Sequence, residues 1–179
     1  PDVPDKVVKT GEMDLEVGTG EVPHILDRLL GLATLKRGFV AESHSTEGDV
    51  PSGSVTLRIP VQSFDDTVAA VRQLQAKVVS QETAGQDVTS KYVDLQARLK
   101  ALQDTRNTFL TLLSKANTIG ETLAVQQHVT DVQTQIEQLQ GQIKVLGNQS
   151  ALSTLTVTVD QRMVPLATKT HHGKSGFRK

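Results

Sequence analysis

Apolar residues recur at alternating steps of four and three from Val88 to Leu146, on both sides of a short polar break. A residue every 3.5 positions keeps one stripe of a helix facing a partner helix, so this spacing predicts an antiparallel coiled-coil helical hairpin. The predicted seam consists of Tyr92, Leu95, Leu99, Leu102, Arg106, Phe109 and Leu113 on the first helix, and of Val125, Val129, Val132, Ile136, Leu139, Ile143 and Leu146 on the second.

The two stripes fit a single register. In an antiparallel pair, facing residues have numbers with a constant sum, and every predicted pair from Tyr92 with Leu146 to Leu113 with Val125 meets this condition. An accidental pattern would drift out of phase over such a length. Each arm of about thirty residues is expected to extend about 40 Å at about 1.5 Å per residue. A rod of this length exceeds what a small sheet needs as a cover, so we expect it to project and to be the working part.

One charged residue, Arg106, interrupts the seam opposite Val132. We expect its aliphatic stem to cover the seam while its guanidinium group reaches solvent or Asp131. The alternative is a charge that sets the register or binds a partner. At the predicted tip, Thr118 and Glu121 have the spacing of a capping box that starts the second helix.

Glutamine dominates the outer faces of the second arm, where exposed coiled coils usually carry Glu and Lys. This surface is either simply solvated or a site of lateral association with a partner or another copy. Gly141 costs about 1 kcal/mol relative to Ala in a helix. It is either simply tolerated at this position or permits close approach of another chain. The candidate partner-binding residues come from the tip and from this surface: Asn117, Thr118, Ile119, Gly120, Gln138 and Gln142.

Two similar segments precede the hairpin. Residues 11–41 and residues 53–79 each contain an alternating stretch, an amphipathic stretch and a second short apolar stretch, which predicts strand, helix and strand. Alternation at period two places the apolar residues on one face of the first strand and Glu12, Asp14 and Glu16 on the other. The order βαββαβ, with helices covering one face, predicts an open antiparallel sheet of the ferredoxin-like type.

Residues 151–160 alternate again and predict a fifth strand, after a helix stop at Gly147 and Asn148. Because the hairpin leaves and re-enters the sheet at one place, we expect its flanking strands to be antiparallel neighbours, in the sheet order 5-4-1-3-2. The predicted fold is therefore α+β, with the coiled-coil hairpin inserted between strands 4 and 5. The predicted domains are residues 9–87 with 150–162 for the sheet, 88–149 for the hairpin, and 163–179 for a polar, basic linker.

Composition excludes several classes of protein. The formal net charge of -1 argues against nucleic-acid partners, since binding them depends on clustered Lys and Arg. The chain has no cysteine, which excludes disulfides, thiolate metal ligands and a cysteine nucleophile. No run approaches the roughly 18 apolar residues of a membrane-spanning helix. We therefore expect any export or anchoring signal to lie outside this sequence.

No residue pattern indicates catalysis, a cofactor or a metal site. Glu12, Asp14 and Glu16 share one predicted sheet face near Arg58, but they lack the loop ligands and the glycine of a calcium site. The pair His171-His172 lacks further ligands. No spacing indicates a Ser/His/Asp set, so we expect a protein that is not an enzyme.

Three separated segments resemble a known family. Residues 87–99 (DVTSKYVDLQARL) and 148–157 (NQSALSTLTV), together with 53–60 (GSVTLRIP) and Phe64-Asp65, resemble the bacterial family called domain of unknown function 4349. The resemblance covers nearly all the chain from about Lys9 to Asp160. It implies an extracytoplasmic domain, often behind a lipoprotein-type signal and ahead of a C-terminal membrane helix, and it transfers no catalytic residue.

The resulting hypothesis is a membrane-tethered interaction or scaffolding domain of the bacterial cell envelope. Its partner would be a protein or a second copy, bound through the hairpin, with membrane contact only through segments outside this sequence. The alternatives are a periplasmic-adaptor-like assembly subunit of a transport system, a ligand-sensing ectodomain and an unrecognised hydrolase.

Within the family-like motifs, Asp94 and Arg98 can pair at i, i+4, and Tyr92 can close the base of the hairpin.

Overall fold

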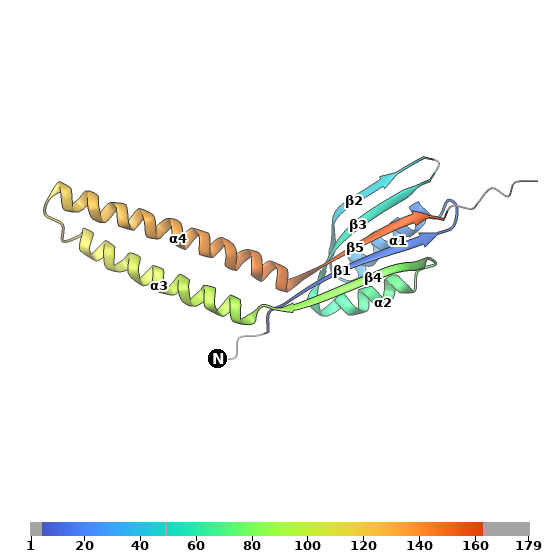
Figure 1. Ribbon diagram of the computed structural model, residues 1–179, viewed down its shortest axis with the longest axis horizontal. Helices are drawn as coiled ribbons and strands as arrows, with labels where there is room; N and C mark the ends of the chain where they lie inside the picture. The colour runs from blue at the N-terminus through green and yellow to red at the C-terminus, as the bar shows by residue number, and fades with distance from the viewer. Residues whose placement is uncertain (1–4, 49, 163–179) are drawn as a thin grey trace, which may run out of the picture.

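The computed structural model describes residues 5–48 and 50–162, which form a mixed α+β structure with a five-stranded sheet and a projecting pair of long helices (Figure 1). The predicted α+β class and the predicted hairpin are both confirmed. The elements in chain order are β1 (Val7–Val17), α1 (Val22–Leu35), β2 (Phe39–Thr46), β3 (Ser52–Pro60), the 3-10 helix η1 (Val61–Ser63), α2 (Phe64–Arg72), β4 (Lys77–Asp87), α3 (Thr89–Leu113), α4 (Ile119–Ala151) and β5 (Leu152–Gln161).

The main core lies between one face of the sheet and the helices α1 and α2. Alternate residues of β1, β3 and β5 point into this core, as strands with a period of two require. The strands contribute Met13, Leu15, Val17, Val55, Leu57, Ile59, Leu155, Val157 and Val159, and the helices contribute Val22, Ile25, Leu26, Leu29, Ala33, Phe64, Val68 and Val71. The core is thus complete without any described residue of α3 or α4.

The strand order is β2-β3-β5-β1-β4, so the expected order 5-4-1-3-2 is wrong. β5 lies in the middle of the sheet, parallel to β1 and antiparallel to β3, and it separates the two strands that are neighbours in a ferredoxin-like sheet. Packed helices lie about 8–10 Å apart, whereas adjacent strands lie about 4.8 Å apart. The two arms of the hairpin therefore align with strands that are two positions apart, and β1 fills the position between β4 and β5.

The passage from the hairpin into the sheet is direct. The expected helix stop at Gly147 and Asn148 is wrong, because α4 continues to Ala151 and Leu152 then begins β5 in an extended conformation. A side chain at Gly147 would begin only 3.9 Å from the ring of Tyr92, so this glycine lies where the two arms meet at the base. The hairpin is therefore joined to the sheet without a loop at this end.

Both edges of the sheet are interrupted. In the edge strand β4, Val79 is an extra residue between two pairs with β1, and in the edge strand β2, Ala41 is an extra residue between two pairs with β3. Such bulges twist an edge and disfavour the addition of a further strand. The sheet edges are therefore poor sites for a partner.

Candidate functional site: the helical hairpin

Every residue of the predicted seam is buried or half-buried between α3 and α4. Leu95, Val132, Ile136 and Leu146 are the most fully enclosed. Across the seam, the ring of Phe109 stacks on that of His128 with 5.3 Å between ring centroids, one residue from Val129, its expected partner. The hairpin is thus held by side-chain packing along its length, as a coiled-coil pair is.

Arg106 lies within the seam, but its partner differs from the expected one. Its Nη1 donates to the amide oxygen of Gln133 at 3.0 Å, while its Nε is buried without a hydrogen-bond partner among the described residues. Asp131 accepts instead from Gln127 at 2.9 Å, so the expected contact with Asp131 is wrong. Gln133 is adjacent in sequence to Val132, the residue that faces Arg106, and is therefore within reach of the guanidinium group.

The base of the hairpin forms a small core of its own. Lys6 places its ammonium group 5.1 Å from the centroid of the Tyr92 ring, and Asp94 pairs with Arg98 at 3.0 Å, as their spacing predicts. This base core connects the hairpin to β1 through Val8. Its members are Val8, Val88, Tyr92, Leu95, Leu139, Ile143 and Leu146.

The predicted capping box is confirmed at the tip. The hydroxyl of Thr118 accepts from the backbone N–H of Glu121 at 3.2 Å, and the Glu121 carboxylate accepts from the N–H groups of Asn117 at 3.0 Å and Thr118 at 3.3 Å. These backbone donors lower the pKa of Glu121 below its ordinary value, with Asn117 the larger cause. The candidate residues Asn117, Thr118, Ile119 and Gly120 thus lie together at a fixed start of α4.

Large apolar side chains surround this tip and remain exposed. We call Leu110, Leu112, Ile119 and Leu123 the apolar tip; their exposed fractions are 44%, 48%, 80% and 65%. Only Ile119 was among the candidate residues. Leu110, Leu112 and Leu123 are recognisable in the sequence as apolar residues at positions outside the heptad stripe.

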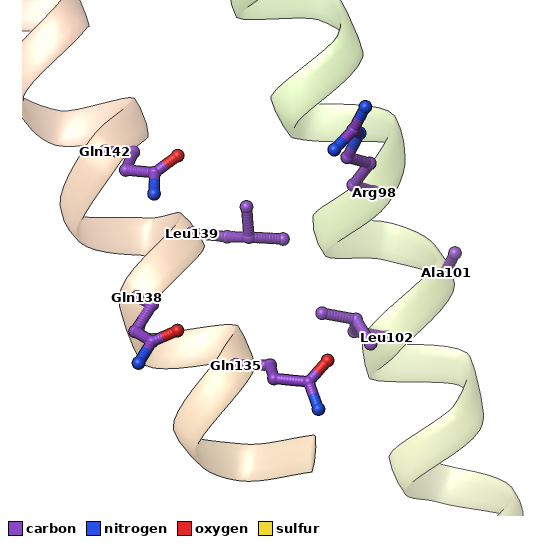
Figure 2. Close-up of a pocket in the computed structure, with 7 residues that line it drawn as sticks. All are labelled: Arg98, Ala101, Leu102, Gln135, Gln138, Leu139 and Gln142. Carbon is purple, nitrogen blue, oxygen red and sulfur yellow. The ribbon is translucent and has the colours of Figure 1, made fainter. Parts of the chain in front are cut away.

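A groove runs along one side of the hairpin, and Figure 2 shows its tip-side half. Leu102 and Leu139 point toward each other from the two arms, with glutamine side chains beside them. This half has a volume of about 410 Å³, and an adjoining hollow of about 390 Å³ shares Gln138 and Gln142 with it. We call the two together the lateral groove; its lining consists of Lys91, Leu95, Arg98, Ala101, Leu102, Gln135, Gln138, Leu139, Gly141, Gln142, Val145, Leu146 and Gln149.

The lining of the lateral groove is suited to packing and hydrogen bonding. It contains amides, apolar side chains and the two cations Lys91 and Arg98, and no carboxylate, histidine or hydroxyl group. Gln138 and Gln142, two of the candidate residues, lie at its centre. The other candidate residues lie at the tip, so the structure divides the candidates between two surfaces.

The acidic residues of β1 lie on the sheet face opposite the core. Glu16 accepts from Arg162 at 2.7 Å and lies 3.9 Å from Lys77; the hydrogen bond from Arg162 is the main cause that lowers the pKa of Glu16. Arg58 donates to Thr154 on β5 at 2.6 Å, and β5 lies between its strand and β1. Glu16 pairs with Arg162 and Lys77 instead of Arg58. Within residues 5–48 and 50–162, no cluster of three or more His, Asp or Glu could hold a metal ion. His171 and His172 lie outside the described residues.

This chain is an α+β protein whose sheet carries a projecting helical hairpin, and in its described part no helix is both long and apolar enough to cross a membrane. The family model for Domain of unknown function (DUF4349) matches residues 5–179, so the chain belongs to this family, as its motifs indicate. No curated protein and no solved structure matches it.

Proposed function

We propose that this chain is a non-enzymatic interaction or scaffolding domain, membrane-tethered on the extracytoplasmic side of the bacterial envelope, and that the end of its hairpin is the contact surface. The extracytoplasmic location and the tether rest on what the family resemblance implies. The contact surface rests on the apolar tip. We interpret the sheet as a ferredoxin-like arrangement of β1 to β4 with β5 inserted between β1 and β3. This sheet is the platform that carries the hairpin.

The apolar tip supports this proposal because its side chains take no part in either core of the protein. Ile119 and Leu123 are the two most exposed of the four, and the capping box beside them fixes the first turn of α4. Burying an Ile or Leu side chain is worth about 1.5–3 kcal/mol, so a partner that covers both gains several kcal/mol. A site on a preformed turn loses little conformational entropy when the partner binds.

A periplasmic-adaptor-like assembly subunit is the second candidate. The observation that favours it is the place of the hairpin in the chain, between two strands of the sheet, with its tip far from the platform (Figure 1). This candidate predicts a ring or a trimer in solution, whereas the interaction domain needs neither. Light scattering of the purified ectodomain separates the two.

The test of the contact surface is photocrosslinking of the full-length protein in its native envelope. A photoreactive residue at Leu123 is expected to crosslink to one defined protein, whereas the same probe at exposed Lys100, in the middle of α3, is not. The double variant Ile119→Asp/Leu123→Asp is expected to remove the crosslink from a probe at Leu112. Because both replaced side chains are exposed, helical circular dichroism should stay unchanged. Equal crosslinking from Leu123 and Lys100, or no crosslinked protein at all, would contradict the proposal.

A further inference from the structure

We propose that a second copy of this chain packs into the lateral groove, antiparallel and arm against arm, so that two hairpins form a four-helix bundle. This inference goes beyond the proposed function, because a contact at the tip needs no second copy. It rests on the difference between the two sides of the hairpin, on the chemistry of glutamine, on charge complementarity and on the area available.

The two sides of α4 differ in charge and in hydrogen bonding. On the side opposite the groove, Gln133 is engaged by Arg106 and donates to Glu137 at 2.8 Å, and Lys144 follows on the same side. On α4 itself the groove side is uncharged from Gln135 to Gln149, about four turns, and the two cations of the groove belong to α3. Among the described residues, the glutamines of α4 whose side chains form hydrogen bonds are Gln127 and Gln133, and both lie outside this stretch. A merely solvated helix face usually carries charges, so this side has the composition of an interface.

Glutamine is a residue that can face its own copy. Its amide both donates and accepts hydrogen bonds, whereas facing Lys or Glu residues repel. A two-fold interface brings the same surface together from both copies, so each residue must be compatible with itself or its near neighbours. Gly141 lies in the middle of this surface, and a side chain there would meet nothing within 4 Å. The open space lets a second helix approach closely, and half-exposed Val145 would be covered.

Charge favours an antiparallel arrangement. Lys91 lies near the base of the hairpin and Asp131 lies toward its tip, on either side of the glutamine surface. Parallel copies would place each of these charges against its own counterpart. Antiparallel copies, turned about the neighbourhood of Gly141, bring Lys91 of each copy near Asp131 of the other. The pairing occurs twice because of the symmetry. Arg98 then lies close to the axis and meets its own copy, but in each copy Asp94 pairs with it at 3.0 Å.

The area is sufficient for a stable pair. With the axis near Gly141, the two α4 helices overlap for about 21 residues, or about 32 Å. Two arms, each about 10 Å wide, then give a footprint of about 630 Å² per copy. Stable interfaces bury about 800 Å² per partner, and accessible surface exceeds a flat footprint because side chains interdigitate. A pair of hairpins thus reaches the size of an ordinary dimer.

The decisive measurement is the mass of the full chain by light scattering and sedimentation. The native chain is expected to be a dimer that dissociates on dilution. Gln138→Glu/Gln142→Glu and Gln138→Lys/Gln142→Lys are each expected to be monomers, because like charges then meet, and an equimolar mixture of the two is expected to dimerise again. The control Gln126→Glu/Gln140→Glu, on the opposite side of α4, is expected to remain a dimer. A native chain that is monomeric at all concentrations, or charged variants that dimerise as the native chain does, would overturn the inference.

Orientation is tested with cysteines introduced into a chain that has none. A chain with Gln135→Cys is mixed with a chain with Val145→Cys under mild oxidation. Antiparallel copies are expected to give the mixed disulfide, whereas parallel copies would give only like-with-like disulfides and would overturn the arrangement, because these positions are about 15 Å apart along the helix. The tip variants Ile119→Asp/Leu123→Asp should leave the mass unchanged. Loss of the tip contact and loss of the dimer are therefore separate outcomes.

Discussion

Single residues at the tip decide where the second arm begins. The Thr118 hydroxyl accepts from the N–H of Glu121 in the first turn of α4, and the Glu121 carboxylate accepts from the N–H groups of Asn117 and Thr118 just before that turn. Each half of this cap has its own dependence on pH. The hydroxyl of Thr118 acts at any pH, whereas the carboxylate of Glu121 stabilises the turn only while it is ionised.

The Glu121 half of the cap is expected to lose its effect in acid. The pKa of Glu121 is lower in the folded chain than its ordinary value of 4.5. Its contribution to stability is therefore present above pH 4.5 and is lost as the pH falls through the folded pKa. We predict that the difference in unfolding free energy between the native chain and Glu121→Gln, measured by urea titration, shrinks below pH 4.5.

Thr118→Ala serves as the control for this experiment. Loss of an N-cap hydroxyl costs about 1 kcal/mol, and this loss is expected at neutral and at acid pH alike. If the difference between the native chain and Glu121→Gln were the same at both pH values, the carboxylate would have no role in the cap.

At the scale of elements, the seam of the hairpin is set by residues close in sequence, and for this reason its periodicity could be predicted. Ile136 is 1% exposed and faces Leu102 in the register of the stripes. We predict that Ile136→Asp lowers the unfolding free energy by several kcal/mol, because it removes a buried apolar side chain and places a carboxylate in a desolvated seam. Gln140→Asp, at an exposed position of the same helix, is the matched control. Helical circular dichroism and melting that are the same for both variants would contradict the packing of the seam.

The position of β5 could not be predicted from local pattern. The alternation of Leu155, Val157 and Val159 predicts a strand and its buried face, but it carries no information about neighbours. The neighbours follow from the spacing between two packed helices, which depends on how α3 and α4 meet the sheet. For a similar reason, the sequence pattern indicated only Ile119 among the four residues of the apolar tip. Leu123 lies off the stripe, and only the packed hairpin shows that nothing covers it.

At the scale of the whole molecule, residues 5–48 and 50–162 form two cores that share no residue. The main core lies under α1 and α2, and the base core joins the hairpin to β1. Most of the hairpin therefore lies beyond both cores, and its length determines how far the apolar tip stands from the sheet (Figure 1). Its length should then be adjustable without loss of the platform.

Removal of residues 96–109 together with residues 129–142 tests this independence. The two segments face each other in the register of the stripes, and each spans two heptads. The remaining seam residues therefore stay in phase. Leu113 then takes the place of Leu99, and Val125 takes the place of Leu139. We predict that the shortened chain keeps the unfolding transition of its sheet, loses helical signal, and brings the tip about 21 Å closer to the sheet. Removal of residues 129–130 alone turns the distal part of α4 by about 200° and is expected to unzip the distal arms. A matched deletion that unfolds the sheet would show that the distal hairpin contributes to the stability of the platform.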